Sequence, residues 1–203
     1  MERRIQAILF DLGGVVIELG GLPLWREWTG EEDDDVVWSR WLHSQAVRRF
    51  ESGSSEPADF GREIVEEFTL PISPEEFLRE FEFWPRGVYA GVPTLLEATR
   101  RRVRTACLSN CNALHWPRFL GEMGLRDAFD DHFSSHELGT LKPDREIFER
   151  VVARLGLPAA DVVLLDDNQI NVDGARNAGL AAYRVKGPAE LATRLRELGL
   201  VEL

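Results

Sequence analysis

The chain has 203 residues, of which 35 are acidic and 24 are lysine or arginine, so its formal net charge is −11. A surface with this excess of negative charge repels nucleic acid and anionic membranes, and we expect neither as a partner. No apolar stretch approaches the roughly 20 residues that a membrane-spanning helix needs. Residues 1–4 run directly into a strand-like segment, without room for a signal peptide, so we expect a cytoplasmic protein.

Short apolar runs alternate with helical patterns along most of the chain, which is typical of a parallel sheet covered by helices. The expected strands are Ile5–Phe10, Val103–Leu108, His132–Ser134, Val162–Leu165 and Ala181–Val185. The expected helices are Val92–Arg101, Trp116–Met123, Arg145–Leu155, Val172–Ala178 and Ala189–Leu198. The pattern therefore predicts an α/β fold with a Rossmann-like parallel sheet core and helices on both faces.

Between about Ile17 and Ala90 the alternation stops, and no strand is expected there. The helical patterns in this stretch are Asp33–Glu51, Ser55–Phe68 and Ser73–Phe81. Ser73 precedes a proline and has a glutamate three residues later, the spacing of a capping box. We expect a small all-helical cap domain at 17–90, inserted after the first strand into a core domain made of 1–16 and 91–203. Five of the six tryptophans fall in this insert, where helix packing is their default role.

Polar residues follow two of the expected strands. Asp11 ends the first strand, and Gly13 and Gly14 after it allow a sharp turn close to a ligand. A buried aspartate needs a cation or hydrogen-bond donors around it. Ser109 and Asn110 end the second strand, where they could bind an anionic oxygen or cap the next helix.

Two further segments place charged residues at the start of an expected helix or at the end of an expected strand. Lys142 and Lys186 are the two lysines of a chain that otherwise uses arginine, and Lys142 precedes a proline that starts a helix. A lysine there suits a compact point charge, although chance could also place it. Asp166 and Asp167 are adjacent at the end of an apolar strand, where their mutual repulsion calls for a cation. Oxygen ligands of this kind suit Mg²⁺, while a simple turn is the alternative.

Together these segments resemble the four motifs of the haloacid dehalogenase superfamily, over essentially the whole chain outside the insert. The finer pattern is similar to the branch of bacterial sugar-phosphate phosphatases and epoxide-hydrolase N-terminal domains. The matching stretches are Phe-Asp-Leu-Gly-Gly-Val at 10–15, Leu-Ser-Asn at 108–110, Gly-Thr-Leu-Lys-Pro-Asp at 139–144 and Asp-Asp-Asn-x-x-Asn at 166–171.

The resemblance implies a role for each motif residue. Asp11 would be the nucleophile that forms an aspartyl-phosphate, with Ser109 and Lys142 as its catalytic partners. The residues that bind phosphate would be Ser109, Asn110 and Lys142. Those that hold Mg²⁺ would be Asp11, the carbonyl of Gly13, Asp167 and, directly or through a neighbour, Asp166. Asn171 would hold these ligands in position without contacting the metal itself. The implied partner is a small phosphorylated metabolite, and we expect a sugar-like phosphate.

One position departs from the family's phosphatases, which carry a second aspartate, acting as acid and base, where this chain has Gly13. General acid–base catalysis is typically worth about 10²–10⁴-fold, so its loss matters. A bound water or a residue such as Glu18, His43, Glu51 or His115 could replace it. Alternatively, the substrate has a leaving group that needs little protonation, or turnover is largely lost.

Two rival interpretations follow from the same resemblance. A 2-haloacid dehalogenase also lacks the second aspartate and needs no metal, but the Asp166–Asp167 pair would then be poorly placed. A catalytically degenerate binding protein of this fold is the other rival, supported by Gly13 alone. The sequence leaves the substrate, the oligomeric state and any motion of the cap open.

Overall fold

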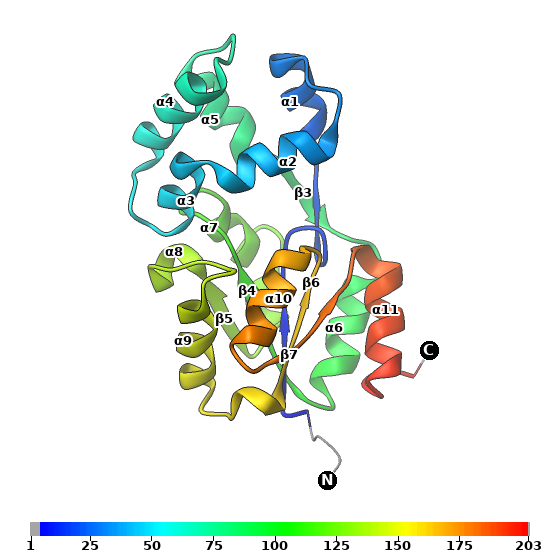
Figure 1. Cartoon of the computed structure of the whole chain (residues 1–203). Coiled ribbons are helices and arrows are strands. Elements are labelled where there is room, and N and C mark those ends of the chain that lie inside the picture. Colours follow the sequence, from blue (N-terminus) through cyan, green and yellow to red (C-terminus); the bar gives the residue numbers. More distant parts are fainter. Residues whose placement is uncertain (1–4, 203) are drawn as a thin grey trace.

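The computed structural model describes residues 5–202. Its described part contains a five-stranded parallel sheet in the order β5-β4-β1-β6-β7, shown in Figure 1. The strands are β1 (Ala7–Phe10), β4 (Arg104–Ser109), β5 (Asp131–Ser134), β6 (Val162–Asp166) and β7 (Ala181–Arg184). Each lies within two residues of its predicted bounds, and the predicted fold class is confirmed.

Helices cover both faces of this sheet. They are α6 (Val92–Arg100), α7 (His115–Leu120), α8 (Ser135–Leu138), α9 (Arg145–Leu155), α10 (Gln169–Asn177) and α11 (Gly187–Glu197). Ile8 and Phe10 of β1 pack with α6, α7 and α11 in one hydrophobic cluster. Ala7 and Leu9 alternate with them and pack with α9 and α10 in a second cluster on the opposite face. Both faces of the central strand are therefore buried, which explains its continuous apolar sequence.

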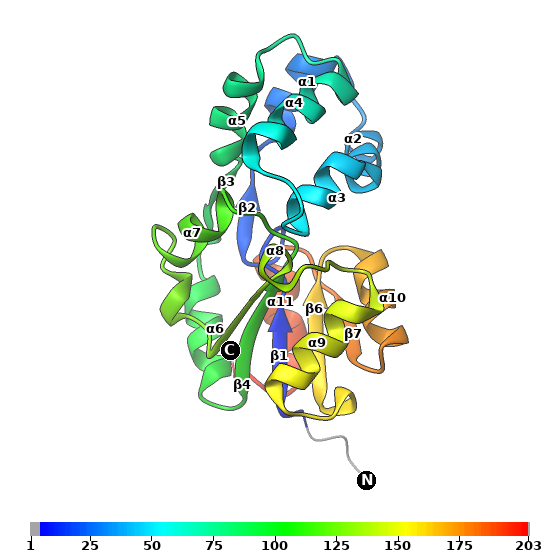
Figure 2. The same cartoon turned by 90° about the vertical axis from the view of Figure 1, so that its left-hand side faces the viewer.

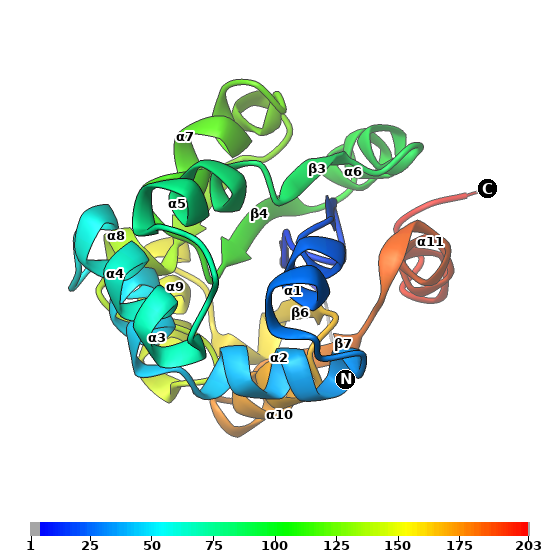
Figure 3. The same ribbon diagram turned by 90° about the horizontal axis from the view of Figure 1, so that it is seen from above.

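A helical segment lies over the end of the sheet at which β1 finishes, as Figures 1 and 2 show from two sides and Figure 3 from above. It consists of α1 (Leu22–Thr29), α2 (Asp34–His43), α3 (Gln45–Glu51), α4 (Pro57–Phe68) and α5 (Pro74–Glu82). Its own core is rich in aromatic rings, including Trp25, Trp41, Phe60, Phe81 and Trp84. The tryptophans of this core therefore have the packing role expected of them. Within residues 5–202, no helix has the length and apolarity to cross a membrane.

The expectation of no strand between residues 17 and 90 is wrong at both ends of that stretch. The chain enters the helical segment through β2 (Ile17–Leu19) and leaves it through β3 (Pro85–Val88), and the two strands pair antiparallel. They have three and four residues, and β3 contains a proline and a glycine, which strand sequences disfavour. Their pairing joins the two ends of the segment, so no local pattern reveals it.

The single helix predicted for Asp33–Glu51 is also wrong, because the chain forms α2 and α3 with a break at Ser44. The Ser44 backbone is extended, and its hydroxyl accepts a hydrogen bond from the Val47 amide at 3.2 Å. A serine that caps a new helix in this way competes with continuation of the previous one. By contrast, the predicted cap at Ser73 is confirmed, with its hydroxyl accepting from the Glu76 amide at 3.2 Å.

Candidate active site

The candidate site lies where β4, β1 and β6 end side by side. Asp11 directly follows β1, Ser109 is the last residue of β4, and Asp166 is the last residue of β6. Lys142 comes from the loop before α9. Parallel strands deliver their carboxyl ends to the same edge of a sheet, which is where open α/β folds place ligands.

Lys142 is the centre of the site. Its side chain is 1% exposed, and its ammonium donates to Asp11 Oδ1 at 2.8 Å, Asp166 Oδ2 at 2.6 Å and the Leu108 carbonyl at 2.9 Å. These three acceptors match the three protons of an ammonium. Burial acts to lower the pKa of Lys142, but the two carboxylates outweigh it and the net shift is upward. Lys142 is therefore held in its charged form against the predicted nucleophile.

The backbone of Lys142 is fixed by Asn110. The side-chain oxygen of Asn110 accepts from the Lys142 amide at 2.8 Å, and its nitrogen donates to the Lys142 carbonyl at 2.9 Å. This pairing joins the end of β4 to the loop that carries the lysine. The side chain of Asn110 thus positions Lys142, and its predicted contact with phosphate stays a prediction.

Asp166 is fully buried and surrounded by donors. Besides Lys142, it receives the Asn168 amide at 2.9 Å and the Asn171 side-chain nitrogen at 3.0 Å, both on Oδ1. Several hydrogen bonds of this kind are what a buried carboxylate needs. The arrangement agrees with the supporting role predicted for Asn171. Asp166 orients the lysine, and a direct contact of Asp166 with a metal remains a proposal.

Asp11, Asp166 and Asp167 each bring a carboxylate oxygen to a common point, where these atoms lie within 4.8 Å of one another. Burial, together with the two neighbouring carboxylates, raises the pKa of Asp11 to about 8, although Lys142 opposes this shift. Burial and then the charge of Asp166 raise the pKa of Asp167 to about 6. A divalent cation here would favour the ionised carboxylates, so the donor set fits a hard metal ion.

The turn after β1 leaves room for this cluster. Gly14 has a φ of 73°, and a Cβ built there would lie 2.3 Å from Asp167 Oδ2. A side chain at this position would collide with the carboxylate and strain the backbone, so glycine is required. Within residues 5–202 the carbonyl of Gly13 accepts no hydrogen bond, as the predicted metal ligand at this position needs.

Ser109 is buried at the end of β4. Its hydroxyl makes a long hydrogen bond of 3.3 Å to the carbonyl of the next residue, Asn110. A contact of this length is weak, so the hydroxyl can turn to a better acceptor. Since β4 pairs with β1, Ser109 ends at the same edge of the sheet as Asp11.

Two contributors were missed in the sequence. The Leu108 carbonyl that binds Lys142 is a backbone group, which no residue type signals. Ser135 follows β5, and its hydroxyl accepts from the Cys111 amide at 2.9 Å and donates to the Glu51 carbonyl at 2.5 Å. A serine just after a buried strand was the available signal, but its partner in α3 could not be foreseen.

The fold and this set of residues define a haloacid dehalogenase-like hydrolase. The family model of that description matches residues 5–179, and the chain belongs to this family of enzymes.

Among the relatives that match most of this chain, three carry phosphatase names. The chain is 26% identical to the phosphatase MT3486 of Mycobacterium tuberculosis, over 89% of this chain and 87% of that protein. It is 26% identical to the sesquiterpene phosphatase astK of Aspergillus oryzae, over 95% and 96%. The D-ribitol-5-phosphate phosphatase of Bacteroides thetaiotaomicron is 21% identical, over 92% and 94%.

The fold also matches solved structures. A wild-type haloacid dehalogenase-family enzyme from Bacteroides thetaiotaomicron, crystallised with magnesium and inorganic phosphate, aligns with a TM-score of 0.72 at 23% identity. The alignment covers 90% of this chain and 94% of that one, so nearly the whole fold is shared.

Proposed function

We propose that this protein is a Mg²⁺-dependent phosphomonoester hydrolase that acts on a small, sugar-like phosphate through an aspartyl-phosphate. The observation that carries the proposal is the buried lysine between two carboxylates, beside a third carboxylate, at one edge of the sheet. A fixed ammonium beside the nucleophilic carboxylate offsets negative charge, and this allows the carboxylate to approach a phosphate dianion.

The metal would be held by the carboxylates of Asp11 and Asp167 and by the carbonyl of Gly13, with Asp166 behind them. When bound, Mg²⁺ supplies positive charge that offsets the charge of the phosphate oxygens. The phosphatase-named relatives and the magnesium and phosphate complex of a protein with the same fold support this assignment.

The residues of this chain would divide the reaction into two displacements at phosphorus. Asp11 Oδ attacks phosphorus as the bond to the leaving oxygen breaks, and water then attacks the aspartyl-phosphate and regenerates the carboxylate. Lys142 holds Asp11 in place, and its ammonium neutralises charge that builds up on the transferring group. Ser109 would donate its hydroxyl proton to a phosphoryl oxygen.

The cap is part of the same proposal. We infer that the helical segment between β2 and β3 is the cap domain of the core formed by 1–16 and 91–203. It lies over the edge of the sheet that carries Asp11 and has its own aromatic core. A cap over the site would exclude water and select the substrate.

The substrate class rests on the motif resemblance and on the D-ribitol-5-phosphate phosphatase among the relatives. The sesquiterpene phosphatase shows that another relative of similar coverage is named for a different substrate. The test must therefore include both polar and apolar phosphates.

The test is phosphate release from a panel of sugar phosphates, a prenyl phosphate and an aryl phosphate, with Mg²⁺ and with EDTA. Wild type is compared with Asp11→Asn, which keeps the shape of the nucleophile. We expect Mg²⁺-dependent release that Asp11→Asn abolishes, fastest with a sugar phosphate. Phosphate release that survives EDTA would refute the Mg²⁺ dependence, and halide release from a 2-haloacid in place of phosphate release would refute the phosphatase in favour of the dehalogenase. No release from any phosphate by folded wild type would favour the degenerate binding protein.

A further inference from the structure

The proposed phosphatase needs a proton donor for the leaving oxygen and a proton acceptor for the attacking water. The position where its relatives' motif carries an aspartate for this purpose holds Gly13. Asp11, Asp166 and Asp167 are committed to the nucleophile and the cation cluster, and Lys142 is held charged by two carboxylates. A side chain that supplies the missing group therefore has to come from outside the motifs.

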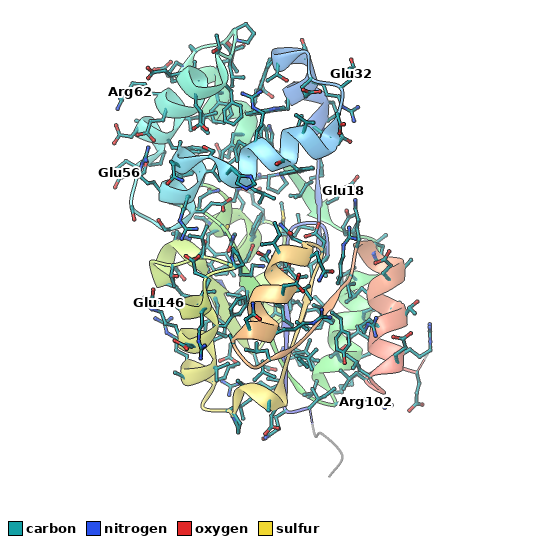
Figure 4. The ribbon with its side chains drawn as sticks, viewed as in Figure 1. Glu18, Glu32, Glu56, Arg62, Arg102 and Glu146 are labelled. Atoms are coloured by element: carbon teal, nitrogen blue, oxygen red, sulfur yellow. The ribbon has the colours of Figure 1, made fainter. Side chains whose placement is uncertain are left out.

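Three of the four candidates named from the sequence are engaged by other groups or exposed to solvent where the structure places them. Both ring nitrogens of His115 are occupied, one by the Phe81 carbonyl at 2.7 Å and the other by an asparagine side chain at 3.2 Å. His43 is exposed, with its Nδ1 2.6 Å from the Ser39 carbonyl of its own helix. Glu18 is exposed on β2, which joins the two halves of the molecule in Figure 4.

Glu51, the fourth candidate, is tied to the segment that follows Ser109. It is the last residue of α3 and is half-buried. Its carbonyl accepts from the Ser135 hydroxyl at 2.5 Å, and that hydroxyl accepts from the amide of Cys111, two residues after Ser109. The end of α3 is thereby docked on the core beside the end of β4, and α3 lies next to α8 in Figure 1.

The turn after Glu51 is built for this close approach. Gly53 has a φ of 73°, and a Cβ built on it would lie 2.4 Å from the backbone oxygen of His136. Only a residue without a side chain allows the turn to pack this closely against the start of α8. The docking of the Glu51 backbone on the core thus depends on two contacts with the same short helix.

The Glu51 carboxylate itself is free for chemistry. Among residues 5–202 it takes part in no hydrogen bond or ion pair, yet it lies close enough to Lys142 to be influenced by that charge. Burial raises the pKa of Glu51 to about 7, although Lys142 acts to lower it. A carboxyl group in this state can both give and take a proton near neutral pH.

We propose that Glu51, supplied by the cap, is the general acid and base that replaces the aspartate missing at position 13. In the first displacement, the Glu51 carboxylic acid gives its proton to the leaving oxygen as the phosphorus–oxygen bond breaks, and the alcohol departs. In the second, the Glu51 carboxylate takes a proton from water as the water oxygen attacks phosphorus. Asp11 then leaves as a carboxylate, and Glu51 is protonated again, so the proton balance closes.

The test uses Glu51→Gln, which keeps the shape and loses the exchangeable proton, beside Glu56→Gln as the matched control. Glu56 is exposed on the outer flank of the same helical segment in Figure 4, and it precedes α4 as an N-cap residue whose side chain makes no capping hydrogen bond. Each is assayed with the alkyl phosphate that wild type hydrolyses fastest and with p-nitrophenyl phosphate, whose leaving group needs no proton.

With the alkyl phosphate, we expect Glu51→Gln to lower kcat by about 10²–10⁴-fold, the usual worth of a general acid or base. With p-nitrophenyl phosphate, it should release one nitrophenolate per enzyme in a fast burst and then turn over slowly, because the second step still lacks its base. Glu56→Gln should match wild type on both substrates. Glu51→Asp, which restores a carboxyl group on a shorter arm, should recover part of the turnover.

Wild-type kcat in Glu51→Gln with the alkyl phosphate would refute the role of Glu51 while leaving the phosphatase intact. An equal loss on both substrates without a burst, in a variant with the wild-type circular dichroism spectrum, would make Glu51 merely structural and also refute it. If wild type releases no phosphate from any substrate, the proposed function itself fails. The three failures are therefore distinguishable.

Discussion

Replacing Lys142 by methionine tests how the site is held together. The change keeps most of the side-chain volume and removes the ammonium that now binds Asp11, Asp166 and the Leu108 carbonyl. Two buried carboxylates then lose their common partner. We predict that the variant binds no substrate productively and is clearly less stable than wild type, by an amount that depends on pH.

The magnitude follows from burial and from the sign of the pKa shift. Removing one partner of a buried ion pair typically costs about 3–5 kcal/mol, because the remaining charge is left without compensation. Lys142 is the group that acts to lower the pKa of Asp11, which is already raised to about 8. Without it, that pKa rises further, and a carboxyl whose folded pKa is raised loses stability as pH increases above its unfolded value of about 3.9. The deficit should therefore be largest at pH 9 and smallest near pH 5.

The assay is urea unfolding of wild type and Lys142→Met at pH 5, 7 and 9 in EDTA. Lys186→Met is the matched control, since Lys186 is the other lysine and is exposed, and we expect it to stay within about 0.5 kcal/mol of wild type. A deficit below about 1 kcal/mol at pH 9, or one that does not grow with pH, would refute our account of the buried lysine.

The remaining predictions concern three other positions. Gly14→Ala would place a Cβ against Asp167 Oδ2, so we expect at least tenfold weaker Mg²⁺ binding by calorimetry, and unchanged binding would contradict the tight turn. Burial lowers the pKa of His115 to about 4, below its unfolded value of about 6.5. Between pH 7 and pH 5 the unfolded chain therefore binds a proton that the folded protein does not, and the unfolding free energy should fall by about 2 kcal/mol. His115→Gln should remove that loss in urea titrations and the exposed His43→Gln should not. Ser73→Ala deletes the cap of α5 and should lower the unfolding free energy by about 1 kcal/mol, a loss that Ser73→Asp should largely avoid.

The sequence is informative where a single segment determines the structure. Each strand of the large sheet is a continuous apolar run, because both faces are covered, and each was placed within two residues. The rule that ligand groups follow parallel strands located Asp11, Ser109 and Asp166 in one place. The strands β2 and β3 are not predictable in this way, because their pairing joins residues at opposite ends of the helical segment.

Within the site, the sequence identified the residues better than their partners. It named Lys142 and Asn110, but it did not show that the Asn110 amide would be used on the lysine's backbone. It offered Glu51 beside three equal candidates, and nothing in the local pattern favoured it. The Ser135 hydrogen bond that brings Glu51 to the core joins residues 84 positions apart, so it exists only after folding.

If Glu51 of the proposed cap supplies the acid and base in place of a residue at position 13, proton transfer becomes conditional on docking of the cap on the core. The cap touches the core near the site through the Ser135 contact and through an ion pair between Arg48 and Asp144. The ion pair is exposed, with 45% and 37% of the two side chains accessible, and such pairs contribute about 0.2–1 kcal/mol. The helical segment also contacts the core through the buried hydrogen bond between His115 and the Phe81 carbonyl, so an opening of the cap for substrate exchange would have to break that bond as well. On our proposal, Asp11 would lack its proton donor whenever the cap is away from the core, so chemistry would occur only when the cap is closed over a bound substrate.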